Sequence, residues 1–386
     1  MLRSRHSRVI CIGAGAAGLY FSTLCHEALV LERNDRPGRK LLITGGGGCN
    51  FTHDLPPSEL SLHYPDRRTF VSPALHAHGA DAIRARFRSL SLESIVTEDG
   101  KVFPRSRDAH DVLYALEKAS GTIVTGCHVD EVHRKDDHFV ISTDMGLFTS
   151  DTLVIATGGL SHPATGSTGD GFAFARSLGH TVVPPRPALC RLELESALPE
   201  CEGISLDEVG LNLDGHKTRG PILFTRTGVS GPAVMNLSRY ATGDSVLRIC
   251  FRDVDEAAIR SLEGRRKAVN AMASALSLPD RLVRALLPSV VDKTIAQLTK
   301  EDMKTCARML RDFSSPCSTS GCMKTATVTR GGVCVDEVDR RTFASRLCPG
   351  LHIIGEALDV DGECGGYNLT FAFASAYAAA KAITTG

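Results

Sequence analysis

Several short stretches of the chain combine glycines with isolated polar residues, as binding sites for phosphate-containing cofactors do. The first reads Gly13-Ala-Gly15-Ala-Ala-Gly18. In this spacing the first glycine makes a tight turn, the second lets a pyrophosphate approach the backbone, and the third lets a helix pack closely. The amides at the start of that helix then hold the diphosphate. The stretch predicts a dinucleotide site contacted by Gly13, Gly15, Ala16, Ala17 and Gly18; a turn that only packs is the alternative.

The elements around this turn favour the dinucleotide interpretation. The β-branched run RVICI (8–12) predicts a strand before the turn, a helix is expected to about His26, and ALVLE predicts a second strand that ends at Glu32. This is the order of a βαβ nucleotide-binding unit. Because Glu32 is placed to accept hydrogen bonds from ribose hydroxyls, it favours FAD or NAD over NADP.

Three later stretches favour FAD over NAD. LVIATGG (153–159) ends an apolar strand in small residues, as a backbone close to a nucleotide requires. GLHIIGE (350–356) places the Glu356 carboxylate where a ribityl hydroxyl would donate to it. GECGGYNLTFAFASA begins a helix from glycines, and its positive end would favour the negative charge of a reduced flavin. NAD has no ribityl chain and needs none of these features.

The stretch LLITGGGGCNFTH (41–53) contains four consecutive glycines. Glycines in series favour neither helix nor strand, so the stretch indicates a close approach that side chains would block. A flexible surface loop is the alternative.

Taken together, these motifs resemble those of the BaiN-like family of FAD-dependent oxidoreductases, which includes aminoacetone-oxidase-like flavoproteins. The resemblance rests on GxGxxG with Glu32, GRKLLITGGGGCN, VFPRS, IATGGLSHPATGSTGDG, LFTRTGVSGPA, TVTRGGVCVDEVD and GLHIIGEALDVDGECGGYNLTFAFASA. It implies an α/β fold in which a Rossmann-like FAD-binding domain is built from both chain ends. A small β-barrel domain carrying a helical subdomain is inserted into it.

The resemblance also implies that the stretch from Thr44 to Asn50 runs along the flavin. Besides the glycine turn, the expected cofactor contacts are Glu32, Arg33, Lys40, Thr44, Gly45, Gly46, Gly47, Cys49, Asn50, Val129, Ala156, Thr157, Gly158, Gly355, Glu356, Asp359, Gly365, Gly366, Tyr367, Asn368 and Leu369. Three features depart from the family pattern. Gly48 stands where an arginine is usual, Arg226 stands where a histidine is usual, and the helix between Gly18 and Glu32 is short.

The expected boundaries follow from composition. Closely spaced prolines at 184–187 fit neither a helix nor a central strand and indicate a boundary. Apolar residues recur at helical spacing between Arg265 and Ser320, where no glycine occurs. We expect FAD-binding parts at 1–187 and 336–386, barrel parts at 188–254 and 315–335, and a helical insert at 255–314.

Cysteines and histidines offer weaker candidates. Cys49 has no second cysteine nearby for thiol exchange, which argues against a disulfide reductase. Cys317 and Cys322 lack the further ligands that a zinc site requires, and no metal is expected. His53, His162 and Arg226 are candidates for substrate binding or proton transfer, with a structural role as the alternative for each.

The overall composition limits the partners. Among 386 residues, 44 basic and 44 acidic side chains give a formal charge of zero, which does not favour nucleic acid or anionic membranes. Thirteen scattered cysteines indicate a reducing compartment, and we expect the cytoplasm. A signal peptide is the alternative for the N-terminal stretch, which is better explained as a strand and turn.

The sequence therefore predicts an FAD-dependent oxidoreductase that transfers a hydride between flavin N5 and a small organic substrate. A second GxGxxG motif is missing, so either NADH or NADPH serves as a transient reductant or the substrate is itself the reductant. Two alternatives remain. One is an RNA-modifying flavoenzyme, which should carry a basic face, and the other is a non-catalytic FAD-binding protein.

Overall fold

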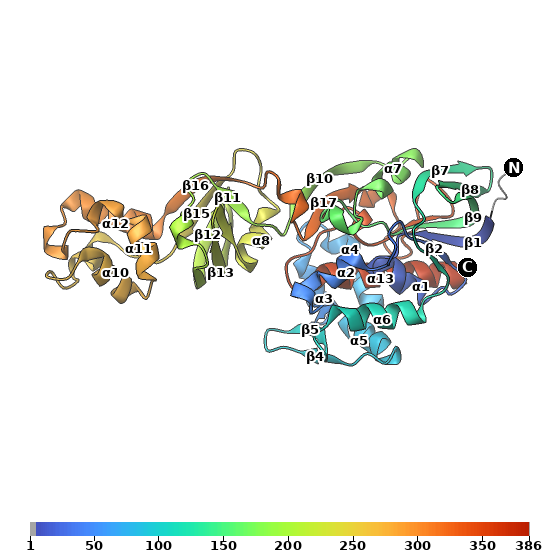
Figure 1. The fold of residues 1–386 in the computed structure, drawn as a ribbon, viewed down its shortest axis with the longest axis horizontal. Coiled ribbons are helices and arrows are strands. Elements are labelled where there is room, and N and C mark those ends of the chain that lie inside the picture. The colour runs from blue at the N-terminus through green and yellow to red at the C-terminus, as the bar shows by residue number, and fades with distance from the viewer. Residues whose placement is uncertain (1–4, 386) are drawn as a thin grey trace. The chain divides into compact units, whose positions relative to one another are not determined.

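The computed structural model describes residues 5–385. They form two compact units: the first runs to Arg186 and resumes at Met323, and the second is Pro187–Cys322 (Figure 1). The return to the first unit at Met323 therefore comes earlier than the expected return at residue 336.

The first unit is built on a seven-stranded sheet in the order β6-β2-β1-β9-β8-β7, with β18 also paired to β9. Strands β1, β2, β6, β9 and β18 run parallel, and β7 and β8 are antiparallel to their neighbours. The strands are β1 (Arg5–Ile12), β2 (Leu29–Leu31), β6 (Ile123–Val124), β7 (Val129–Lys135), β8 (His138–Thr143), β9 (Gly146–Ile155) and β18 (Leu351–Ile353).

The register of the parallel strands brings the glycine motifs to one edge of the sheet. Ile12 lies opposite both Leu31 and Ile155, and Ile155 lies opposite Ile353. The residues that follow these four strands therefore leave the sheet together. In open parallel sheets this carboxyl edge is where ligands bind.

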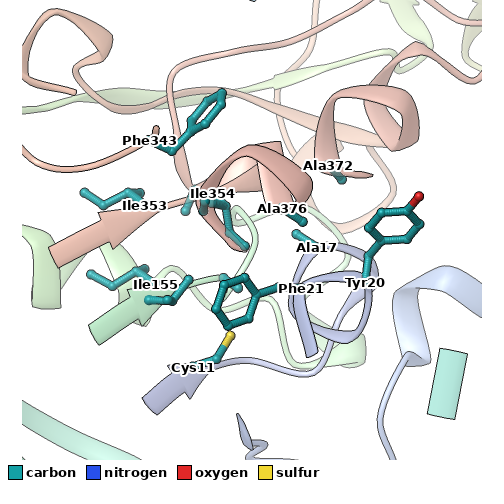
Figure 2. Close-up of a cluster of buried hydrophobic side chains, with 14 of the residues drawn as sticks. Cys11, Ala17, Tyr20, Phe21, Ile155, Phe343, Ile353, Ile354, Ala372 and Ala376 are labelled. Carbon is teal, nitrogen blue, oxygen red and sulfur yellow. The ribbon is translucent and has the colours of Figure 1, made fainter. Parts of the chain in front are cut away.

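Helices cover the sheet and bury its apolar residues. The longest, α13 (Tyr367–Thr385), packs against α1 (Ala16–Ser22), which ends before the expected His26. Figure 2 shows Tyr20 and Phe21 of α1 among buried side chains from β9, β18 and α13. The other helices of this unit are α2 (Arg39–Leu42), α3 (Pro57–Leu60), α4 (Arg68–Ala77), α5 (Ala80–Ser89), α6 (Ala109–Ala119) and α7 (Asp170–Ser177).

Two small sheets complete the first unit. One has the order β3 (Thr52–His53), β5 (Lys101–Pro104) and β4 (Ser94–Val96). The other pairs β10 (Val182–Ala188) with β17 (Val328–Val333). The prolines at 184–187 thus lie in a strand that has one partner and is not central, and the first unit ends among them, at Arg186. A two-stranded sheet leaves one side of each strand unpaired, so the missing proline amides are tolerated there.

The second unit contains a closed barrel in the order β11-β14-β13-β12-β15-β16. Its strands are β11 (Leu192–Leu194), β12 (Ser205–Leu213), β13 (His216–Thr225), β14 (Gly228–Ser230), β15 (Val246–Cys250) and β16 (Phe313–Ser318), with helix α8 (Pro232–Ser238) beside them. Between β15 and β16 the chain forms a helical insert of α9 (Glu256–Arg260), α10 (Ala268–Leu276), α11 (Asp280–Leu286) and α12 (Lys300–Arg311). The barrel confirms the expected fold class.

Across residues 5–385 no helix combines the length and the apolar character needed to cross a bilayer. All thirteen cysteines lie in this range and carry free thiols.

Candidate cofactor and substrate site

The glycine turn is packed at two of its glycines and open at the other. A Cβ on Gly13, whose φ is 103°, would lie 2.6 Å from the Ala156 carbonyl oxygen. A Cβ on Gly18 would lie 1.9 Å from the Gly13 carbonyl oxygen. A Cβ on Gly15, in contrast, would meet no heavy atom within 4 Å. The first and third glycines are therefore required by packing, while the second borders open space suited to a phosphate.

Glu32 follows β2, and its carboxylate accepts a hydrogen bond from the backbone of the glycine turn. Its side chain is buried, with Oε2 accepting from the Ala14 amide at 2.8 Å and Oε1 accepting from the Asn34 amide at 2.9 Å. Oε1 also accepts from Asn34 Nδ2 at 2.7 Å, so both of its lone pairs are used, and Oε2 is the oxygen with a second lone pair for a ribose hydroxyl. Arg33 instead forms an ion pair with Asp170 at 2.6 Å, so its charge is already matched within the protein.

Lys40 and Glu356 are joined in one polar network. Lys40 Nζ donates to Glu356 Oε2 at 2.8 Å and to Ser161 Oγ at 2.7 Å. The Thr329 amide also donates to Glu356 Oε1, at 2.8 Å. The Glu356 carboxylate, which the sequence assigned to a ribityl hydroxyl, thus already has protein donors. Ser161 and Thr329 were not among the predicted residues.

His162 lies beside this network in a left-handed conformation with φ 53°. Burial lowers the pKa of its imidazole, and the charge of Lys40 lowers it further while Glu356 opposes the shift. The surroundings of His162 thus favour the neutral form of its ring next to an ion pair.

The glycine strip from Thr44 to Asn50 contains both open and packed positions. Built Cβ atoms on Gly46 and Gly47 would meet nothing within 4 Å. Cys49 is fully buried, and burial raises the pKa of its thiol to about 12, so it remains protonated. Asn50 is only 9% exposed, and its Oδ1 has no hydrogen-bond partner among the described residues. An unpaired buried oxygen costs about 1–3 kcal/mol, which a donor on a bound cofactor would recover.

The loop before α13 meets this strip. A Cβ on Gly366, whose φ is 92°, would lie 2.8 Å from Asn50 Oδ1. The Asn368 side chain braces the loop, because it accepts from the Gly362 amide at 2.8 Å and donates to the Gly362 carbonyl at 2.9 Å. Helix α13 begins at Tyr367, and the first amides of a helix lack intrahelical acceptors. Two predicted segments more than 300 residues apart thus form one surface.

A ring cluster lies at the same loop. His53 Nδ1 is 3.2 Å from the Gly365 carbonyl oxygen, and the His53 ring stacks on Tyr367. His63 also stacks on Tyr367, with ring centroids 4.1 Å apart, and its Nδ1 is 2.7 Å from Glu363 Oε2. His63 and Glu363 were not predicted, because no local pattern connects residues so distant in the sequence.

The remaining predicted residues lie partly beside these segments and partly away from them. Asp359 is buried and accepts from Arg67 and from the Gly331 amide, which gives it protein partners of its own. Thr157 Oγ1 is buried without a partner among the described residues, and Val129 begins β7. Arg226 is exposed at the turn between β13 and β14 of the second unit. Ala16 and Ala17 lie in α1, and Leu369 lies in α13. The Thr44 hydroxyl donates to the Leu41 carbonyl. Gly45 and Gly158 have positive φ.

The described residues fit a bound FAD. Open backbone borders Gly15 at one end of the site and Gly46 and Gly47 at the other, and a buried carboxylate stands at the end of β2. The unpaired oxygen of Asn50 offers an acceptor at the second end. These features suit an adenine nucleotide joined to a planar ring.

Comparison with known proteins gives consistent matches along the whole chain. Residues 7–382 match the family model described as HI0933-like protein Rossmann domain. The ribosomal RNA dihydrouridine synthase of Escherichia coli is 32% identical over 400 residues and covers 96% of each chain. Its namesake from Haemophilus influenzae is 31% identical over 411 residues and covers 99% of each. The 3-dehydro-bile acid delta(4,6)-reductase of Clostridium scindens is 29% identical over 411 residues, covering 97% of this chain and 98% of the relative.

Solved structures share the fold at low identity. The 3-ketosteroid delta1-dehydrogenase from Sterolibacterium denitrificans has a TM-score of 0.54 and 10% identity, covering 98% of this chain and 100% of that chain. The open form of a flavocytochrome c3 fumarate reductase has a TM-score of 0.53 and 13% identity, covering 99% and 78%.

Proposed function

The chain belongs to the HI0933-like Rossmann family and is an FAD-dependent oxidoreductase, and we propose that it reduces a carbon–carbon double bond conjugated to a carbonyl group. Its resemblance to BaiN-like flavoproteins predicted this family. Within that chemistry we favour uridine in ribosomal RNA as the substrate.

The observation that carries the proposal is that the relatives are named for reactions of the same kind. A dihydrouridine synthase saturates the C5–C6 bond of uracil, which is conjugated to the C4 carbonyl. A delta(4,6)-reductase acting on a 3-keto compound saturates a bond conjugated to that ketone. Both reactions add a hydride to the carbon remote from the carbonyl and a proton to the carbon next to it. The relatives named for RNA are 31–32% identical over nearly the whole chain.

When bound, FAD supplies the hydride from N5 after two-electron reduction. The protein's part is to hold the ring and to stabilise the charge that reduction creates. The start of α13, which lies beside Asn50, would direct amides and a helix dipole toward that charge. NADH or NADPH as a transient reductant completes the electron balance.

His63 is the candidate donor of the proton that is added to the carbon next to the carbonyl. Its Nδ1 is paired with Glu363, and its Nε2 has no hydrogen-bond partner among residues 5–385. The His63 side chain is 31% exposed, so a substrate can reach it. Stacking on Tyr367 fixes the plane of the ring. This is the arrangement of a general acid oriented by a carboxylate. His53, whose Nδ1 faces the Gly365 carbonyl, is the alternative donor.

The test is anaerobic stopped-flow mixing followed by product analysis. The oxidised protein is mixed with NADH or NADPH, and the reduced protein is then mixed with unmodified ribosomal RNA or with a steroid enone. We expect RNA to reoxidise the flavin and to gain two hydrogens per uridine by mass spectrometry. Reoxidation by the enone alone would favour a small-molecule substrate, as in the Clostridium scindens relative. Reoxidation by neither would contradict the proposal.

The proton donor is tested by His63→Gln and the matched variant His53→Gln. We expect His63→Gln to slow flavin reoxidation by substrate and to remove one limb of its pH profile, while reduction by NAD(P)H keeps its rate. The same pattern in His53→Gln alone would assign the donor to His53. Ribosomal RNA as substrate also agrees with a reducing cytoplasmic location, which the thirteen free thiols favour.

A further inference from the structure

We propose that the helical insert of the second unit binds the phosphate backbone of RNA through the exposed basic face of α12. This inference rests on the proposed function, because it supplies the RNA contact that such a function needs. An RNA-modifying flavoenzyme is expected to carry a basic face, and the exposed face of α12 is such a surface.

The insert is strongly basic although the whole chain is neutral. Residues 256–311 contain eleven Lys and Arg against six Asp and Glu, a formal charge of +5, so the remainder of the chain carries −5. An excess of this size within 56 consecutive residues creates a local positive potential that the net charge conceals.

The positive charge is ordered along α12. Lys300, Lys304, Arg308 and Arg311 follow one another at intervals of four, four and three residues, and all four are exposed. At 3.6 residues per turn these positions fall within about 80° of the helix circumference. They therefore form one stripe, about 16 Å long at a rise of 1.5 Å per residue.

The stripe is available for a partner. None of its four side chains has an ion-pair or hydrogen-bond partner within residues 5–385. Of the two acidic residues of α12, Asp302 is occupied, because it accepts from Lys293 at 2.8 Å and caps the helix with Thr299. Glu301 is the remaining acid on this helix. Elsewhere on the insert, charges such as Arg284 with Asp280 are paired.

The spacing of the stripe suits a nucleic acid backbone. A cation every three or four residues gives one positive charge about every 5–6 Å, so several phosphates of one strand are engaged at once. An anionic membrane is a poorer match. The apolar residues of α12 (Met303, Cys306, Ala307 and Leu310) are buried within the insert, so the exposed face offers no side chains for insertion into a bilayer.

The α12 triple variant, Lys300→Gln with Lys304→Gln and Arg308→Gln, tests the proposal. Glutamine keeps a high helix propensity, so the fold of the insert should persist, which circular dichroism checks. The control triple variant, Lys135→Gln with Lys217→Gln and Lys381→Gln, removes the same charge from exposed positions elsewhere.

The measurement is binding of a labelled uridine-rich ribosomal RNA fragment at several salt concentrations. Each lost phosphate contact lowers the slope of log K against log salt by about 0.7–0.9, so the α12 triple variant should lose about 2–3 from the slope. The control triple variant should keep the wild-type slope. Equal slopes in all three proteins, or binding of phosphatidylglycerol vesicles without binding of RNA, would overturn the proposal.

The same proteins separate this inference from the proposed function. If RNA binding depends on α12 but uridine is not reduced, the binding surface stands and the proposed reaction fails. If uridine in RNA is reduced and the α12 triple variant has the wild-type KM, the reaction stands and the binding surface fails.

Discussion

Two substitutions in the glycine turn should have opposite effects on the cofactor-free protein and on FAD binding. A Cβ at Gly15 meets nothing within 4 Å, whereas a Cβ at Gly18 lies 1.9 Å from a carbonyl oxygen. Gly15 has φ −82° and ψ −166°, an extended conformation that valine adopts readily. We therefore expect Gly15→Val to leave the fold intact and to occupy the space of the pyrophosphate. Gly18→Ala should instead strain the turn itself.

The magnitudes follow from these contacts. Overpacking of the kind expected at Gly18 costs about 1–3 kcal/mol, more than the roughly 1 kcal/mol that alanine gains over glycine in a helix. The free energy of unfolding should therefore fall, and Tm should drop by about 1–2 °C per kcal/mol for a chain of this size. At Gly15 the cofactor-free protein should lose under about 1 kcal/mol, the usual range for a changed N-cap. FAD at a hundredfold excess over Kd stabilises a protein by about 2.7 kcal/mol, and Gly15→Val should forfeit this stabilisation.

The assay is thermal unfolding of the wild type and both variants, each without cofactor and with excess FAD. Wild-type Tm should rise with FAD, Gly15→Val should start near the wild-type value and not rise, and Gly18→Ala should start lower. Isothermal titration calorimetry measures the FAD affinity directly. A Gly15→Val protein that binds FAD with wild-type affinity would refute the reasoning, because the pyrophosphate would then lie elsewhere.

Three further predictions concern the flavin end and the core. Cys49→Ser should preserve flavin reduction by NAD(P)H within about twofold, because a buried thiol with a raised pKa supplies no thiolate; lost reduction with FAD retained would instead make the thiol catalytic. Gly366→Ala should lower the flavin potential by roughly 10–40 mV in spectroelectrochemical titration, because its Cβ would displace amides from the reduced ring, whereas Gly179→Ala, at the same φ of 92° but with open space, should not change it. Burial lowers the pKa of His78 to about 4. As pH falls from about 6.5 to 4, His78 therefore gains a proton in the unfolded state and not in the folded state. Urea unfolding should show up to roughly 3 kcal/mol of stability lost over that window. His78→Gln, which retains a partner for the Tyr20 hydroxyl, should flatten this dependence; an unchanged profile would assign the loss to other groups.

The glycine turn and the elements around it were predictable because their signals are local. The turn, the strand before it and Glu32 lie within 25 consecutive residues, and each has a role that spacing alone defines. The parallel register then places the later glycine motifs at the same edge of the sheet. This arrangement follows from the rule that parallel strands have their carboxyl ends at the same edge of the sheet.

The ring cluster was not predictable for the opposite reason. His63 and Glu363 are 300 residues apart and meet only because the loop before α13 folds over the segment after β3. Neither lies in a motif with a defined spacing, and histidines are otherwise dispersed along the chain. Ser161 and Glu356 are likewise 195 residues apart, whereas Thr329 precedes Glu356 by only 27 residues but lies in a different motif. Contacts between residues of different motifs can be identified only from the tertiary structure.

The proline segment shows how far a local rule reaches. Proline is disfavoured in central strands because it cannot donate to the ladder, and on that ground 184–187 was interpreted as a boundary. The structure places these residues in β10, whose only partner in its sheet is β17. A strand with one partner needs donors on one side only, so an edge strand remains compatible with the prolines. The sequence alone does not reveal how many partners a strand will have.

Net charge is a coarse guide for a related reason, since a sum over the chain does not record where the charges lie. A formal charge of zero argued against nucleic acid, yet the insert has a charge of +5 and the remaining residues a charge of −5. Electrostatic attraction to a polyanion acts over roughly a Debye length, about 8–10 Å at physiological salt, so a stripe of about 16 Å is felt as a basic surface whatever the distant residues carry. The sign of a local helix face is therefore the better guide to a partner. If the proposed RNA contact exists, confining the positive charge to the insert would limit RNA binding to that surface, because a uniformly basic chain would bind RNA at unproductive positions as well.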